Sequence, residues 1–120
     1  MPSTNIRAIQ LNLGVFLADN NVRRSLANLG FNYSSAAGNV VDSYVTVNEL
    51  GGTFTWTSPM NPAKCLVVTT DQPLQIDITP RSGPGSSNNL NQLLVVDYDV
   101  SQIILTNNGS LPARVVIIQI

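Results

Sequence analysis

The sequence predicts an all-β protein, an antiparallel β-sandwich or jelly roll. Short runs rich in β-branched and aromatic residues recur along most of the chain. Apolar and polar residues alternate within several of these runs, as they do in strands that bury one face. Gly, Pro and Asn separate the runs at fairly regular intervals, which is typical of sandwiches and jelly rolls.

The first forty residues are expected to hold a strand, a short helix and a loop. Residues 9–13 alternate apolar with polar side chains, which predicts a strand, and residues 1–13 together form an extended N-terminal arm or strand. Residues 22–29 space their apolar side chains at i, i+4 and i+7, so we predict a helix of about two turns there. A strand over the same residues is the alternative. Residues 32–39, made mostly of Asn, Ser, Ala and Gly, predict a loop.

Two strands are predicted next, over residues 41–47 and 53–57. The second alternates Thr with aromatic residues, so Phe54 and Trp56 share one face. The connection at 48–52 contains two glycines and is typical of a hairpin.

The remaining strands are predicted from alternation, from apolar runs and from the turns between them. Residues 81–89 are rich in Gly, Pro, Ser and Asn and predict an exposed loop between two strands. The last strand is apolar on both faces, which predicts that it is tied into a sheet. The predicted strands cover residues 64–70, 74–79, 93–98, 100–106 and 113–120.

The length of 120 residues predicts one sandwich domain over 1–120. No apolar run approaches the roughly 20 residues that cross a bilayer, so no membrane partner is expected. The beginning of the sequence lacks the pattern of a secretory signal, which predicts assembly in a cytoplasm or release by a route without a signal peptide. The net charge is −1 and the six basic residues are scattered, so no nucleic-acid partner is expected either.

The residue types needed for most enzymatic chemistry are scarce. The chain has no His and a single Cys, which argues against Ser-His-Asp triads, cysteine-based metal sites and internal disulfides. Asp97 and Asp99 could serve a glycosidase or bind Ca²⁺, but we favour a strand edge facing water. We therefore expect a non-enzymatic protein with no cofactor and no metal.

Uncharged polar residues take the place of charge in this chain. Only 13 of the 120 residues are charged, whereas Asn, Ser, Thr and Gln number 14, 11, 9 and 6. Amides and hydroxyls are easier to bury with a partner than ions are, which favours a protein packed against other chains. Because the chain has a single Lys, its strand edges lack the charged side chains that usually prevent pairing with another chain. The last strand is therefore either covered in the fold or paired with a partner. A closed homo-oligomer such as a trimer fits this composition.

Two segments carry a resemblance to a known group of proteins. Residues 66–79 (LVVTTDQPLQIDIT) and 103–117 (IILTNNGSLPARVVI) resemble small virion proteins of tailed bacteriophages, in which a closing hairpin completes a compact β-sandwich. That group includes head decoration, or cement, proteins, which often sit on the capsid lattice as trimers, and accessory tail or fibre proteins. The resemblance covers about half of the chain and carries over no site residue.

The resemblance implies a capsid decoration protein that stabilises a bacteriophage head by bridging capsid subunits. Its partners would be other copies of itself and the major capsid protein or other virion proteins, and it would be found in the virion after assembly in the host cytoplasm. The alternatives are a tail or fibre accessory protein, and a carbohydrate-binding β-sandwich module that uses Trp56. The N-terminal segment and the 81–89 loop are the expected contact surfaces, with candidate interface residues Ile6, Arg7, Ile9, Leu11, Arg81, Ser82, Asn88 and Asn89.

Overall fold

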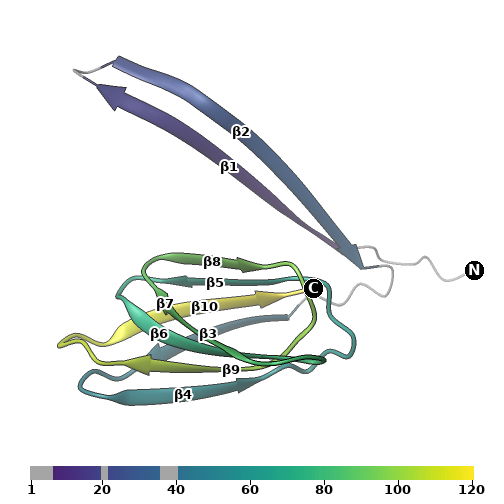
Figure 1. Ribbon diagram of the computed structural model, residues 1–120, viewed down its shortest axis with the longest axis vertical. Coiled ribbons are helices and arrows are strands. Elements are labelled where there is room, and N and C mark those ends of the chain that lie inside the picture. Colours follow the sequence, from purple (N-terminus) through teal and green to yellow (C-terminus); the bar gives the residue numbers. More distant parts are fainter. Residues whose placement is uncertain (1–6, 20–21, 36–40) are drawn as a thin grey trace, which may run out of the picture. The chain divides into compact units, whose positions relative to one another are not determined.

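The structure, a computed structural model, describes residues 7–19, 22–35 and 41–120, and it describes side chains from residue 41 onward together with those of Asn12 and Ser25. The chain divides into two compact units, Met1–Asn39 and Val40–Ile120. Every regular element of the described residues is a β-strand (Figure 1). No helix long and apolar enough to cross a membrane occurs among these residues.

The first unit contains an antiparallel pair, β1 (Arg7–Asp19) and β2 (Val22–Ser35). The strand predicted at 9–13 is confirmed within β1, whereas the helix predicted at 22–29 is wrong and the strand alternative holds. An isolated helix of about two turns is marginal without packing, because helix nucleation is unfavourable. Pairing along β1 instead provides backbone partners for this segment except at Leu26, where the register shifts. The loop predicted at 32–39 is also wrong up to residue 35, and residues 36–39 lie outside the described part.

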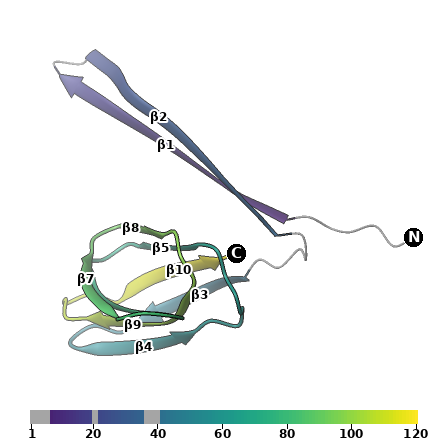
Figure 2. The ribbon, with the colours of Figure 1, turned by 45° about the vertical axis from the view of Figure 1, so that its right-hand side comes forward.

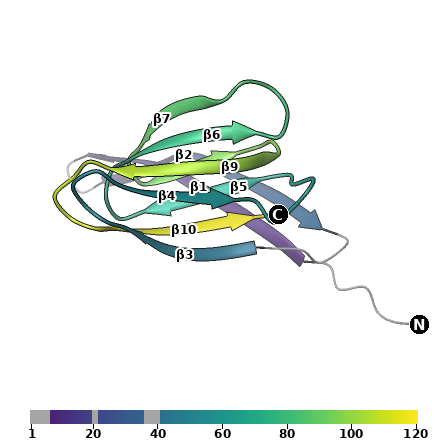
Figure 3. The same cartoon turned by 90° about the horizontal axis from the view of Figure 1, so that it is seen from below.

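The second unit is a sandwich of two four-stranded antiparallel sheets. One sheet has the order β3-β10-β5-β8 and is named here the β10 sheet, and the other has the order β4-β9-β6-β7 and is named the β9 sheet. Figure 2 shows these two layers obliquely, and Figure 3 shows them from below. The strands are β3 (Val41–Val47), β4 (Gly52–Thr57), β5 (Leu66–Thr70), β6 (Leu74–Pro80), β7 (Ser86–Leu90), β8 (Leu93–Val96), β9 (Val100–Asn107) and β10 (Ala113–Gln119).

The predicted sandwich class is confirmed, but the pairing of neighbouring strands differs from the prediction. We expected residues 41–47 and 53–57 to form a hairpin, yet β3 pairs with β10 and β4 pairs with β9. The chain crosses to the other sheet after each strand of this unit except β6, which forms a hairpin with β7. Each strand of the sandwich except β7 presents one apolar face, and crossing to the other sheet places the apolar faces of consecutive strands on opposite sides of the core.

The loop predicted at 81–89 is wrong in its second half. Ser86–Leu90 forms the edge strand β7, whose backbone pairs with β6. The four polar residues of β7 are exposed, whereas Leu90 is buried in the core. Polar composition therefore did not prevent a strand here, because this edge position requires few buried side chains.

The core lies between the two sheets and is built from alternate residues of each strand. β10 contributes Val115 and Ile117, and its central place between β3 and β5 covers both of its edges. The β9 sheet contributes Trp56, Ile76 and Leu105. The apolar C-terminal strand is therefore covered within the fold. Of the two possibilities that the sequence left open, a covered edge and an edge paired with another protein, the first holds for this strand.

Two buried amide side chains connect the sheets. Gln119 on β10 donates from Nε2 to the carbonyl oxygen of Val100 on β9 at 3.1 Å, and its Oε1 accepts a hydrogen bond from Ser58 Oγ at 2.5 Å. Asn107 on β9 donates from Nδ2 to the carbonyl oxygen of Val47 on β3 at 3.0 Å. Both amides are fully buried. Each of them therefore satisfies polar groups that would otherwise lie unpaired in the core.

Asn107 also organises the turn between β9 and β10. Its Nδ2 donates to the carbonyl oxygen of Leu111 at 2.8 Å, and its Oδ1 accepts from the backbone N–H of Gly109 at 3.0 Å. The neighbouring turn is held in place as well, because Gly51 N donates to the carbonyl oxygen of Asn107 at 2.7 Å and Leu50 N donates to that of Gly109 at 2.9 Å. One residue thus links two of the crossings between the sheets.

Replacing Asn107 by Ala should lower the free energy of unfolding by about 3 kcal/mol, since buried carbonyl groups lose their donor. Urea denaturation would measure this change. The matched control is Asn108→Ala, whose exposed side chain makes no hydrogen bond with the described residues, and it should change stability by no more than about 0.5 kcal/mol. Equal effects of the two substitutions would contradict the role assigned to Asn107.

Replacing Leu50 by Asn should raise the free energy of unfolding by about 1 kcal/mol, because Leu50 has a left-handed backbone conformation that Asn tolerates better. Its φ is 60° and its side chain is 82% exposed, so little packing is lost. Leu111→Asn is the control, because Leu111 is also exposed but is not among the described residues with positive φ. A gain no larger than that of the control would show that Leu50 is unstrained.

Candidate interaction surfaces

The residues predicted as an interface are divided between the two units. Arg7, Ile9 and Leu11 lie on β1, and their side chains are outside the description, as is Ile6 altogether. The other four lie in the sandwich. Arg81 and Ser82 directly follow β6, whereas Asn88 and Asn89 lie on β7.

Arg81 has structural partners within the sandwich. Its Nε contacts Asp99 Oδ2 at 3.3 Å, its Nη2 donates to the carbonyl oxygen of Met60, and its backbone N–H donates to the carbonyl oxygen of Asp99 at 2.9 Å. The second carboxylate oxygen of Asp99 accepts from the backbone N–H of Ala63 at 3.1 Å. Arg81 and Asp99 thus join three loops at one end of the sandwich, and the Asp99 carboxylate is occupied by this contact.

Two side chains considered for binding or chemistry, Trp56 and Cys65, are buried. Trp56 is 6% exposed and belongs to the core, with its Nε1 donating to Ser43 Oγ at 3.4 Å. A buried indole ring leaves no face for a sugar to stack on, so the sugar site considered at Trp56 is wrong. Cys65 is fully buried. No group of three or more His, Cys, Asp or Glu that could hold a metal ion occurs in the described residues.

The outer surface of the β10 sheet carries exposed apolar side chains, and we name it the apolar face. Tyr44, Val116, Thr69 and Leu93 form one row across the four strands, and the next row is Asp42, Ile118, Val67 and Val95. Tyr44 is 76% exposed, Leu93 48% and Val95 36%, whereas Val116, Ile118 and Thr69 are half-buried and Val67 is buried. The only charged residues that strands β3, β5, β8 and β10 place on this face are Asp42 and Arg114.

A shallow hollow of about 210 Å³ lies beside Tyr44 on the apolar face. Strands β3 and β10 provide its lining, which is mostly apolar but includes Arg114 at one end. A hollow of this kind can accept one side chain of a protein partner. The lining residues are Tyr44, Val45, Thr46, Arg114, Val115 and Val116.

The outer surface of the β9 sheet has a different character. Its edge strand β4 exposes Thr53, Thr55 and Thr57, and the neighbouring strands add mainly Gln and Thr side chains. Hydroxyl and amide groups are well solvated, so this surface has little apolar area to bury. The two sheets therefore give the sandwich one apolar and one polar outer surface.

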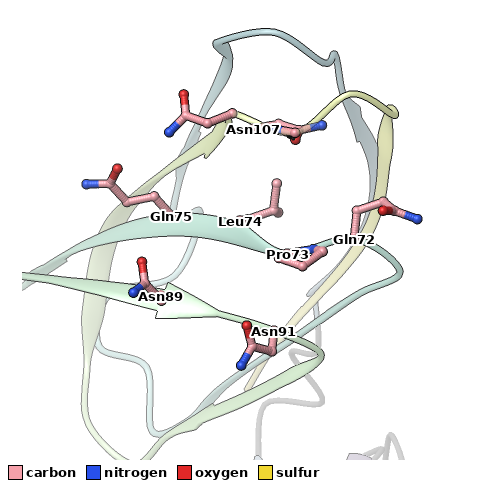
Figure 4. A pocket seen from close by; sticks show the side chains of 9 residues that line it. Gln72, Pro73, Leu74, Gln75, Asn89, Asn91 and Asn107 are labelled. Carbon is pink, nitrogen blue, oxygen red and sulfur yellow. Dashed lines mark hydrogen bonds between the residues drawn. The ribbon is translucent and has the colours of Figure 1, made fainter.

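A second hollow, of about 350 Å³, is lined mainly by amide side chains, and we name it the amide hollow (Figure 4). Its lining comes from strands β6 and β7, from the end of β9, and from the turns before β6, after β7 and after β9. None of its lining residues is charged. They are Gln72, Pro73, Leu74, Gln75, Asn89, Asn91, Asn107, Asn108 and Gly109.

Of the residues that line the amide hollow, only Asn89 is among the interface residues predicted from the sequence. The amide hollow gives no local signal, because its residues come from separate segments. The apolar face did leave a signal in the sequence. The apolar runs 93–96 and 115–118 supply side chains to both faces of the sheet, which is more than the core alone requires.

Comparison with known proteins adds little to this geometry. No protein-family model matches the chain, and no curated protein matches it. The solved structures that are similar include the crystal structure of PirA, which is 16% identical, with a match that covers 66% of this chain and 93% of that one and a TM-score of 0.44. A likeness of this size carries no argument about function.

Replacing Arg81 by Ala should lower the free energy of unfolding by about 1 kcal/mol, because the substitution removes a partly exposed ion pair and a hydrogen bond to a backbone carbonyl. Thermal and urea denaturation would measure the loss. Ser82→Ala is the neighbouring control and should leave stability unchanged, because Ser82 is exposed. If Arg81→Ala is also neutral, then Arg81 is available as a contact residue, as the sequence predicted.

Proposed function

We propose that this chain is a non-enzymatic structural protein of a bacteriophage virion that decorates the capsid and stabilises it by bridging capsid subunits. The two segments that resemble virion proteins correspond to β5 with β6 and to most of β9 with β10. β5 pairs with β10 in one sheet, and β6 pairs with β9 in the other. The resemblance thus covers the four central strands of the sandwich, and it supports a virion β-sandwich protein as the proposed class.

The observation that carries the proposal is the apolar face. Monomeric soluble proteins rarely leave a contiguous apolar surface open, and such surfaces usually mark contacts with other proteins. Here the face extends across four strands, with Asp42 on its edge strand and Arg114 beside the hollow near Tyr44. A capsid subunit can cover this face without removing a large number of charges from water, which keeps the desolvation cost low.

The scarcity of charged residues in this chain supports association with further copies. The chain has only 13 charged residues and one Lys, so contacts between identical copies meet little charge repulsion. The edge strands β7 and β8 carry no charged residue, and such edges lack a common barrier to pairing with another chain. A decoration protein requires more than one contact to bridge subunits, and a trimer would multiply the available contacts. The proposal therefore includes a homo-oligomer bound at the virion surface.

Replacing Leu93 by Glu should abolish capsid binding, because the new carboxylate would be buried against the shell without a partner. Empty capsid shells of the phage that encodes the chain would be sedimented with purified protein, and the bound fraction measured. We expect the wild-type chain to co-sediment and Leu93→Glu to bind at least tenfold more weakly. Size-exclusion chromatography with light scattering would give the oligomeric state.

Thr55→Glu is the matched control, since Thr55 is exposed on the outer surface of the other sheet. It introduces the same charge and should leave co-sedimentation unchanged. Circular dichroism would verify that both variants fold. The proposal fails if the wild-type chain stays in the supernatant as a monomer, and the role of the apolar face fails if both variants bind equally.

A further inference from the structure

We propose that the amide hollow is a binding site for a neutral saccharide. This activity goes beyond the virion role and stands on a different surface, away from the apolar face. Three features support it: the chemistry of the lining, the rigidity of the turns that hold the lining, and the free hydrogen-bonding capacity of its amides.

The lining matches the groups that a sugar offers. A side-chain amide both donates and accepts hydrogen bonds, and so does each hydroxyl of a sugar ring. Pro73, exposed just before β6, adds apolar surface against which the C–H groups of a ring can pack, whereas Leu74 behind it is buried in the core. Because no charged residue lines the hollow, it offers nothing to neutralise a phosphate, a carboxylate or a metal ion. The chemistry therefore favours an uncharged polyhydroxyl ligand.

The turns around the hollow are held by hydrogen bonds that use one lining amide, the fully buried Asn107, and leave most of the exposed amides unused. Before β6, Thr70 Oγ1 donates to the carbonyl oxygen of Gln72 at 2.7 Å and accepts from its backbone N–H at 3.3 Å. The backbone N–H of Thr70 donates to the carbonyl oxygen of Gln92 at 3.0 Å, which connects this turn to the turn after β7. On the opposite side, Asn107 fixes the turn that carries Asn108. The backbone positions that carry the amides are thus set before a ligand arrives, which reduces the entropy lost on binding.

Four of the lining amides are free to bind. The side chains of Gln72, Asn89, Asn91 and Asn108 form no hydrogen bond with the described residues. Gln75 uses its Nε2 for Ser87 Oγ at 3.1 Å, which leaves its carbonyl oxygen available. In Figure 4, Gln75 on β6 lies beside Asn89 on β7, with Asn91 just beyond the end of that strand. Several donors and acceptors therefore surround one small volume without being used by the protein.

The volume of about 350 Å³ is near the lower end of small-molecule sites and suits a short saccharide rather than a large ligand. The site is shallow and has no aromatic ring in its lining. We therefore expect a dissociation constant on the order of 1 mM for a single chain, as is usual for a small polar ligand. Several copies on one particle would raise the apparent affinity for a surface that presents many sugars.

The test is an NMR titration of the full chain labelled with ¹⁵N. Maltotriose, cellotriose and chitotriose are each added to about 20 mM, which is well above the expected dissociation constant. At least one of the three should shift the resonances of Gln75, Asn89, Asn91 and Asn108. Asn89→Ala and Asn91→Ala should each weaken this binding at least fivefold. Trp56 fluorescence should remain unchanged, because its ring is in the core.

Asn88→Ala is the matched control, because Asn88 is the exposed neighbour of Asn89 on β7 and does not line the hollow. It should bind the trisaccharide as the wild type does. Leu93→Glu should also bind it normally, which separates failure of this site from failure of the capsid role. The proposal is overturned if none of the trisaccharides shifts these resonances, if Asn88→Ala weakens binding as much as Asn89→Ala, or if only triglycine or sodium phosphate produces the shifts.

Discussion

The buried amide of Asn107 is the interaction on which the arrangement of this sandwich depends most directly. It bonds to β3 in the opposite sheet and closes the turn into β10, while its backbone carbonyl accepts a bond from the turn between β3 and β4. The chain crosses between sheets after almost every strand, so the relative position of the sheets is set at these turns. A buried amide with three partners holds the turns in one geometry, because any shift would leave polar groups unpaired in the core.

Gln119 has the equivalent role at the other end of the sandwich, where it bonds to Val100 and Ser58. The two amides lie at the ends of β9 and β10, the strands that are central in their respective sheets. Between them the core is apolar and continuous. Uncharged polar residues, which dominate the composition, thus serve inside the fold as well as on its surface, where amides also line the hollow beside Asn107.

The scarcity of charge has different consequences on the two outer surfaces. On the β9 sheet, Thr and Gln side chains keep the surface hydrated, and Asp77 is the one charged residue that its strands carry. On the β10 sheet, the strands buried on their inner side continue to be apolar on their outer side, which leaves Tyr44, Leu93 and Val95 in contact with water. These exposed side chains lie outside the hydrophobic core of the sandwich. They are the feature of the fold that a protein partner accounts for best.

The sequence by itself determined the class of the fold and the positions of most strands after residue 40, because alternation and turn residues are local properties. It also identified Trp56 and Phe54 as residues of one face, and it excluded chemistry that needs His. Only the tertiary structure decided which strands pair, since a connection such as 48–52 suits a hairpin and a crossing between sheets equally well. It also decided that residues 22–29 extend along β1 and that amides from three separate stretches of the chain meet in one hollow. Those outcomes depend on backbone partners and on proximity between distant residues, which no local pattern encodes.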